Sequence, residues 1–232
     1  MTRSTEFPLN CYDYEVRRFE DRLDAGAALG AKLAPSLASR VGGVVVLGIP
    51  RGGVPVAFEV AVALASPLDV VIVRKIGVPT QRELAMGAIG EAGATVVEVD
   101  VVRSLNVSDE QFADVLARER SELDRRVRLY RGASEQSDIK GRTVVIVDDG
   151  IATGSSVRAA CQVARLRGAS RLVVATPVSS VEAATRLQRE VDAFVSLITV
   201  EGPFAVGNWY QHFEQTSDEQ VLNYLELSAA RW

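Results

Sequence analysis

The chain has 232 residues, of which 47% are hydrophobic and 24% are charged, and its formal net charge at pH 7 is −4. This length and composition suit a globular protein with its own core, and the acidic balance argues against a broad nucleic-acid-binding surface. No apolar run approaches the roughly 20 residues of a membrane-spanning helix, and the N-terminal segment lacks the apolar core of a signal peptide, so we expect a cytoplasmic protein.

The predicted elements follow the order of an α/β protein. Apolar residues at helical spacing predict an opening amphipathic helix within residues 15–39. Strand-like apolar runs follow at residues 44–49, 68–73, 95–99, 143–147, 171–176 and 192–198, and helical patterns at 54–65, 108–130, 156–167, 180–190 and about 218–230. Because Val- and Ile-rich strands alternate with helices, we predict a mainly parallel sheet flanked by helices on both faces. Since we find no repeat or linker, we interpret residues 1–232 as a single domain.

Two of the predicted helices carry further signals. The last one follows Thr216 and Ser217, either of which can cap its N-terminus. The 108–130 segment is rich in charged residues between Arg118 and Arg126, which we interpret as a solvated helix face.

Cysteine and histidine are scarce in this chain. Cys11 and Cys161 are the only cysteines, and without a secretory signal we expect free thiols rather than a disulfide. His212 is the only histidine and no Cys/His cluster exists, which disfavours a structural zinc site. A Ser-His-Asp hydrolase is disfavoured as well, because no G-x-S-x-G motif is present.

The most informative segment is residues 144–156, which read VVIVDDGIATGSS. An apolar run suited to a buried strand leads to Asp148 and Asp149, and a turn rich in Gly, Thr and Ser follows. Carboxylates can accept hydrogen bonds from sugar hydroxyls, and the N–H groups and hydroxyls at a helix start can bind a phosphate. The segment therefore suits a sugar phosphate. An ordinary acidic turn is one alternative; a nucleotide hydrolase is another, but it needs a G-x-x-x-x-G-K-[ST] loop that the chain lacks.

A second candidate phosphate loop, GIPRGGVPVA, ends the first predicted strand at residues 48–57. Ligands of parallel sheets bind beyond the carboxyl ends of the strands, where backbone N–H groups and the Arg51 guanidinium can bind a polyanion. The alternative is a tight turn that merely needs glycine. The next run ends in VRKIGVP at residues 73–79 and supplies two further cations, Arg74 and Lys75.

These segments resemble the signature of the type I phosphoribosyltransferases, which bind 5-phosphoribosyl 1-diphosphate (PRPP). The likeness covers nearly the whole chain and is strongest to a bacterial group of this family. It includes R-F-x-D-R-x-x-A-G at residues 18–26, G-I-P-R-G-G, V-R-K, and A-V-G-x-W-Y at 205–210. Two positions depart from the family pattern: Gly150 stands where an aliphatic residue is usual, and Ser155 where a second glycine is common. The resemblance implies a type I phosphoribosyltransferase fold with a small C-terminal hood, here residues 199–215.

The resemblance also implies a role for each matching residue. Asp148 and Asp149 would face the ribose 2′- and 3′-hydroxyls, and Mg²⁺ would be held through PRPP or by these two carboxylates. The 5′-phosphate would bind Ala152, Thr153, Gly154, Ser155 and Ser156. The pyrophosphate would bind Arg51, Gly52, Arg74 and Lys75, at a loop that often contains a non-proline cis peptide bond. The residues expected to take part in catalysis are Asp148, Asp149, Lys75 and Glu83.

The stretch after Pro79 resembles the start of the flexible loop that closes over PRPP in this family. Arg82 and Glu83 would lie on or near that loop, with Glu83 as a candidate base. A surface ion pair is the alternative for both residues.

The hood would cover the acceptor. Phe204, Trp209 and Tyr210 could stack on a planar ring, or they could form the small core of the hood, which is the preferred interpretation. The implied function is transfer of phosphoribose from PRPP to a nitrogen acceptor, such as a nucleobase, in nucleotide metabolism. Its partners would be small molecules and a second copy of the chain. The alternatives are a PRPP- or nucleotide-sensing regulator without catalysis, and a phosphatase-like use of the same phosphate site.

Overall fold

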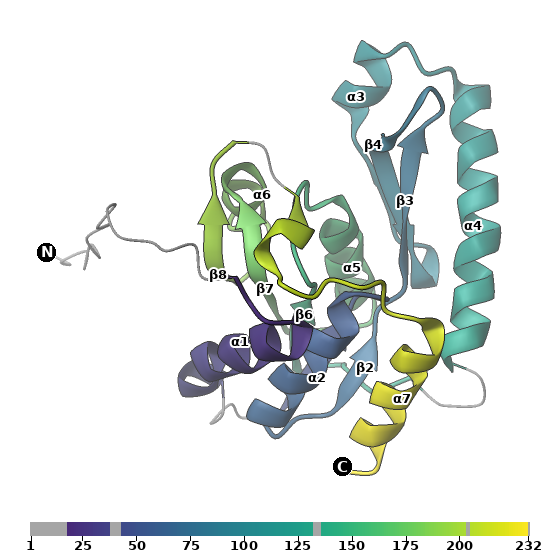
Figure 1. The fold of residues 1–232 in the computed structure, drawn as a ribbon. Coiled ribbons are helices and arrows are strands. Elements are labelled where there is room, and N and C mark those ends of the chain that lie inside the picture. The colour runs from purple at the N-terminus through teal and green to yellow at the C-terminus, as the bar shows by residue number, and fades with distance from the viewer. Residues whose placement is uncertain (1–17, 38–42, 132–135, 203–204, 232) are drawn as a thin grey trace, which may run out of the picture.

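The computed structural model describes residues 18–37, 43–131, 136–202 and 205–231, apart from the side chains of residues 82, 83 and 92. Its main sheet has five parallel strands in the order β2-β1-β6-β7-β8 (Figure 1). These strands are β1 (Val44–Gly48), β2 (Leu68–Val70), β6 (Thr143–Val147), β7 (Arg171–Ser180) and β8 (Ala193–Val200). The predicted α/β class with a mainly parallel sheet is therefore confirmed.

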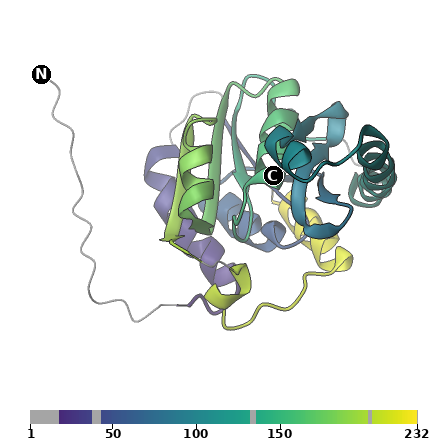
Figure 2. The same ribbon diagram turned by 90° about the horizontal axis from the view of Figure 1, so that it is seen from above.

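Helices cover both faces of the main sheet, as the view from above shows (Figure 2). One face is covered by α1 (Arg22–Leu37), α2 (Gly53–Ala63) and α7 (Asp218–Ala229), and the other by α5 (Ser155–Leu166) and α6 (Val181–Leu187). Alternate residues of a strand point to opposite faces. Thus Val46 packs in the core with Leu29 of α1, whereas Leu47 packs in the second core with Val157 of α5. Burial on both faces explains why these strands read as unbroken apolar runs.

A second, antiparallel sheet stands beside the carboxyl edge of the main sheet (Figure 1). It contains β3 (Val73–Val78), β4 (Gln81–Gly90) and β5 (Thr95–Val97). Two further helices, α3 (Val99–Ser104) and α4 (Asp109–Arg131), follow it in the chain. The sheet contacts α4 on one side and α5 on the other, so it borders the edge where parallel strands present their ligand sites.

This sheet corrects three expectations from the sequence. The 68–73 run is not one strand, because β2 ends at Val70 and β3 begins a different sheet at Val73. Residues 95–97 pair with β4 instead of joining the parallel sheet. The stretch after Pro79, expected to resemble a flexible loop, forms the long strand β4. For β3 and β4 the physical reason is that Pro79 and Thr80 make a short connection, which suits antiparallel neighbours and is too short for a parallel crossover.

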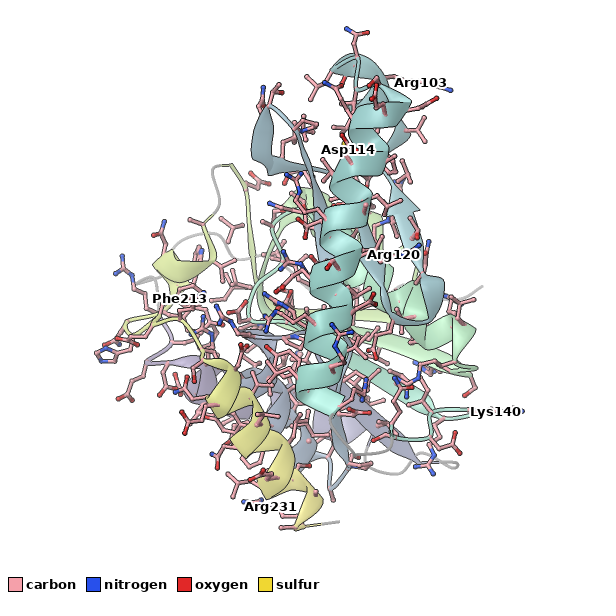
Figure 3. All side chains as sticks on the ribbon, turned by 90° about the vertical axis from the view of Figure 1, so that its right-hand side faces the viewer. Arg103, Asp114, Arg120, Lys140, Phe213 and Arg231 are labelled. Atoms are coloured by element: carbon pink, nitrogen blue, oxygen red, sulfur yellow. The ribbon has the colours of Figure 1, made fainter. Side chains whose placement is uncertain are left out.

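The last residue of α4, Arg131, ties this part of the chain to the main sheet. Its guanidinium donates to Asp69 Oδ1 at 2.6 Å and to Glu91 Oε1 at 3.0 Å, and both acids are buried. Glu91 also accepts from the Ile72 N–H group at 2.9 Å, at the junction between the two sheets. Removing one charge from such a network leaves its buried partners uncompensated, so Arg131 is expected to be important for stability. The outward side of α4, with Asp114 and Arg120, is exposed, as predicted (Figure 3).

Several smaller expectations can be compared with the structure. Ser217 caps α7 in a capping box with Gln220. Cys161 is a free, buried thiol whose pKa burial raises to about 12, and Cys11 lies outside the described residues. Within the described ranges, no helix is both long and apolar enough to span a bilayer.

Candidate functional site

The acidic pair lies at the carboxyl end of the central strand β6. Asp148 and Asp149 follow Val147 directly, and Val147 pairs with Gly48, the last residue of β1. The N–H group of Asp149 donates to Asp148 Oδ1 at 3.0 Å, so the first carboxylate is oriented by the backbone of the second. Both residues are partly buried.

Both carboxyl groups have raised pKa values. Burial and then the neighbouring charge of Asp149 raise the pKa of Asp148 well above its usual value. Burial also raises the pKa of Asp149, and the charge and hydrogen bond of Arg22 oppose that rise. Because two adjacent ionised carboxylates repel each other, this pair favours a ligand that brings hydroxyl donors or a cation.

The loop after β1 meets the acidic pair. A Cβ atom on Gly52 would lie 2.0 Å from Asp149 Oδ2, and one on Gly53 would lie 2.9 Å from the Cα atom of Asp148. Only glycine allows this approach of backbone to carboxylate. The peptide bond between Pro50 and Arg51 is cis. The structure thus brings Gly52 against Asp149, because β1 and β6 are neighbouring parallel strands.

The Arg51 side chain extends toward α7. Its Nη1 atom lies 3.8 Å from Asp218 Oδ1 at the start of α7, and the two side chains are 27% and 34% exposed. The Tyr130 hydroxyl near the end of α4 donates to the same Asp218 oxygen. Asp218 is a neighbour of the candidate polyanion loop that sequence reasoning missed, because it lies far along the chain in a helix start.

The predicted 5′-phosphate loop runs from Ala152 to Ser156, and Gly154 lies in the left-handed region at φ 79°. Gly154 is the N-cap of α5 and supplies no side-chain cap, so the first N–H groups of the helix face a loop rather than a capping oxygen. Ser180 Oγ fixes the loop by donating to the Ala152 carbonyl at 2.7 Å. Ala152, Thr153 and Ser155 line a cavity of about 420 Å³. These features suit the start of α5 to an anion.

Arg74 and Lys75 lie on β3 and line a cavity of about 410 Å³ together with Arg118 of α4. Arg74 donates to Glu119 Oε2 through both Nε and Nη2, at 2.9 and 2.7 Å. Glu119 and Tyr130 are eleven residues apart on α4, or about 16 Å along its axis at ~1.5 Å per residue. Arg74 is thus held by Glu119 of α4, whereas Arg51 pairs with Asp218 of α7, which contacts α4 near its C-terminal end through Tyr130. Glu83 lies on β4, and its side chain is not among those described.

The described aromatic residues of the hood pack against one another. Tyr210 is 3% exposed, its ring stacks on Phe213 with centroids 4.9 Å apart, and its hydroxyl donates to the Asp149 carbonyl at 2.6 Å. Trp209 is partly buried against the same cluster, and Phe204 lies outside the described residues. The family departure at Gly150 has a local explanation, because Val206 of the hood would lie 2.4 Å from a Cβ atom there.

Arg22, the first residue of α1, is a site residue to which sequence reasoning assigned no role. Its Nε atom donates to Asp149 Oδ2 at 2.8 Å. The surrounding backbone joins two distant segments: Phe19 N–H donates to the Trp209 carbonyl at 2.9 Å, and Gln211 N–H to the Phe19 carbonyl at 2.8 Å. We call residues 18–22 and 209–214 together the strap. The only sequence signal for it was the pair of family motifs at residues 18–26 and 205–210.

Among the described residues, no group of three or more His, Cys, Asp or Glu side chains could hold a metal ion. The two carboxylates of Asp148 and Asp149 are consistent with Mg²⁺, which usually keeps several waters and binds one or two carboxylates together with substrate phosphates.

Comparisons with known proteins identify relatives of this chain. Residues 21–211 match the profile described as "Phosphoribosyl transferase domain". Two curated proteins of Mycobacterium tuberculosis, from strains CDC 1551 and H37Rv, are provisionally named phosphoribosyl transferases and are each 47% identical over 211 residues. The matches cover 91% of this chain and 47% of each relative, so the chain spans about half the length of these proteins. The crystal structure of TT1426 from Thermus thermophilus has 44% identity and a TM-score of 0.75, covering 90% of this chain and 97% of that chain.

Proposed function

Since the chain belongs to the phosphoribosyl transferase domain family, we propose that it binds PRPP with Mg²⁺ and transfers phosphoribose to a nitrogen acceptor of the nucleobase type, releasing pyrophosphate. One observation carries the proposal: the glycine loop after β1 meets the acidic pair after β6, and the same chain segment continues into the loop at the start of α5. This arrangement places candidate binding sites for a polyanion, a sugar and a phosphate next to one another. PRPP contains all three of these groups.

Asp148 and Asp149 bind the ribose hydroxyls in this proposal. Ionised carboxylates accept hydrogen bonds strongly, and hydroxyl donors offset the repulsion between two partly buried acids. The 5′-phosphate binds at Thr153, Ser155 and Ser156, where hydroxyls and the uncapped N–H groups of α5 can donate.

Arg51, Gly52, Arg74 and Lys75 bind the diphosphate. Arg51 exchanges its contact with Asp218 for the ligand, because a pair at 3.8 Å between partly exposed groups is weak. Arg74 and Lys75 come from β3, so their approach involves a movement of the antiparallel sheet or of these two side chains. Such closure would exclude water from the sugar.

Transfer breaks the bond between ribose C1 and the diphosphate oxygen and forms a bond from C1 to the acceptor nitrogen, whose proton passes to solvent or to Glu83. Positive charge develops on the ribose ring and negative charge on the leaving diphosphate. The carboxylates of Asp148 and Asp149 hold the ring, and Arg51 with Lys75 favours departure of the diphosphate. Mg²⁺ bound with PRPP would supply further charge neutralisation.

The experiment that tests the proposal is calorimetric titration with PRPP, with and without Mg²⁺, followed by a pyrophosphate-release assay over a panel of nucleobases. We expect Mg²⁺-dependent binding and release with at least one base. The matched control is the Asp148→Asn, Asp149→Asn double variant, which preserves side-chain shape and should lose binding. Binding without release from any base would favour the sensing alternative, and no binding of PRPP would contradict the proposal.

Two further expectations belong to this proposal. The reaction takes place in the cytoplasm, and the active form is a homodimer. Light scattering of the purified chain measures the oligomeric state directly, and a monomer that retains PRPP binding would contradict the dimer.

A further inference from the structure

Arg22 is held in one orientation by three different contacts. Its Nε atom donates to Asp149 Oδ2 and its Nη1 atom to the Glu214 carbonyl, both at 2.8 Å. The guanidinium carbon also lies 3.9 Å from the centroid of the Phe213 ring. The Arg22 side chain is only 12% exposed. A planar, rigid fork can satisfy a carboxylate, a carbonyl and an aromatic face together, whereas an ammonium group is a point charge.

The strap binds both the side-chain carboxylate and the backbone carbonyl of Asp149. Arg22 binds its carboxylate, and the Tyr210 hydroxyl donates to its backbone carbonyl at 2.6 Å. Tyr210 is fixed in turn by its β-bridge with Phe19, three residues before Arg22. The other acid, Asp148, accepts a hydrogen bond from the N–H group of Asp149. Fixing Asp149 therefore orients both members of the acidic pair.

We propose that Arg22 is a positioning residue for the sugar-binding acids: it fixes Asp149 through Oδ2 and offsets the charge of the pair. A carboxylate has about four acceptor positions, so one bond from Arg22 leaves acceptor capacity for a ribose hydroxyl. This inference rests on the proposed binding of PRPP. It extends that proposal, because Arg22 lies in α1 and does not belong to either phosphate loop.

The test is a double-mutant cycle between Arg22 and Asp149, in which the affinity for three ligands is measured. Arg22→Gln removes the charge, Arg22→Lys keeps the charge without the fork, and Arg18→Gln is the matched control at an exposed arginine on the same segment. Affinities are measured for PRPP, ribose 5-phosphate and inorganic pyrophosphate. The fraction folded is checked for each variant by circular dichroism.

We expect Arg22→Gln to weaken PRPP and ribose 5-phosphate by about 10-fold or more and pyrophosphate by less than about 2-fold, since loss of a charge-assisted contact acts on the sugar site alone. Arg22→Lys should be intermediate. In the Asp149→Asn background the Arg22→Gln effect should fall to less than about 3-fold, because the two residues act as one unit.

The proposal is overturned if Arg22→Gln weakens all three ligands equally, which a general structural role would produce, or if its effect is unchanged in the Asp149→Asn background. If the wild-type protein binds ribose 5-phosphate but not PRPP, the proposed function fails while the Arg22 series is still read on ribose 5-phosphate. If it binds neither, both proposals fail.

Discussion

Gly52 and Asp149 approach so closely that no side chain fits between them, since a Cβ atom on residue 52 would lie 2.0 Å from Asp149 Oδ2. The carboxylate cannot easily move aside, because Arg22 holds that same oxygen at 2.8 Å. We therefore expect Gly52→Ala to weaken PRPP binding by about 10-fold or more and to lower stability by ~1–3 kcal/mol, the usual range for overpacking. Titration calorimetry and thermal unfolding measure the two effects.

The control for this prediction removes the other partner of the clash. In an Asp149→Ala background, Gly52→Ala should cost little additional stability in thermal unfolding. An equal cost in both backgrounds would mean that the glycine is needed for the loop backbone and not for its approach to the carboxylate.

Asp148→Asn should stabilise the protein at neutral pH while abolishing PRPP binding. Burial and the Asp149 charge raise the pKa of Asp148, so its ionised form is disfavoured in the folded state. A raised carboxyl pKa gives a contribution to stability that is complete below the unfolded value of about 3.9 and is lost as the pH rises through the folded value. The neutral Asn side chain does not ionise, so the variant does not lose this stability as the pH rises. We expect a gain on the order of 1 kcal/mol, or about 2–4 °C in Tm, at pH 7 and none near pH 3.5.

Thermal unfolding between about pH 3.5 and pH 8, on either side of the unfolded carboxyl pKa, checks this pattern. The control is Asp124→Asn on the exposed side of α4. A lower Tm for Asp148→Asn at neutral pH would mean that the ionised carboxylate stabilises the fold, contrary to the direction of its pKa shift.

Arg51→Ala should weaken the binding of ligands that contain a diphosphate more than the binding of ribose 5-phosphate. We expect it to weaken PRPP and pyrophosphate by about 10-fold or more and ribose 5-phosphate by less than about 2-fold, because a lost charge-assisted bond costs ~1.5–3 kcal/mol. Asp218→Asn is the control, since it removes the 3.8 Å pair with Arg51 but keeps the guanidinium. Equal losses for PRPP and ribose 5-phosphate would place Arg51 outside the diphosphate site.

Gly154→Ala should weaken PRPP and ribose 5-phosphate together. Residue 154 has φ 79°, where a Cβ atom costs ~1–2 kcal/mol, and it starts the helix that faces the predicted phosphate. Gly141→Ala is a matched control, because Gly141 has φ 72° and open space around it but lies away from the loop. Both variants should lose similar stability in thermal unfolding, and only Gly154→Ala should lose affinity. Similar affinities in the two variants would contradict a phosphate site at α5.

The parallel core could be predicted from the sequence because its signal is local. The strands β1 and β6 are buried at all five positions, and burial on both faces demands an unbroken apolar run. The antiparallel sheet was missed for the opposite reason. Its β5 strand has only three residues, and a short run does not reveal which neighbour it pairs with.

The candidate site likewise contains residues that the sequence could predict and residues that it could not. Asp148, Asp149 and the loop to Ser156 are consecutive, so residue order alone brought them together. Arg22 contacts Asp149 across 127 positions, and no local pattern encodes such a contact. The different partners of Arg51 and Arg74 were likewise hidden, because Asp218 and Glu119 lie on helices far from both arginines in the sequence. The assigned ligand roles and the single-domain interpretation stay predictions.

The strap has a consequence for the order in which the site forms during synthesis. Asp149 receives its carboxylate partner from residue 22 and its carbonyl partner from residue 210, so the acidic pair has its final surroundings only after residue 210 is made. Contacts across such long stretches form late in folding. A nascent chain that ends after both phosphate loops already contains Arg22, but it still lacks the Tyr210 hydroxyl that binds the Asp149 carbonyl. Under the proposed function, full ligand affinity is therefore reached only after residues 209–214 of the strap leave the ribosome.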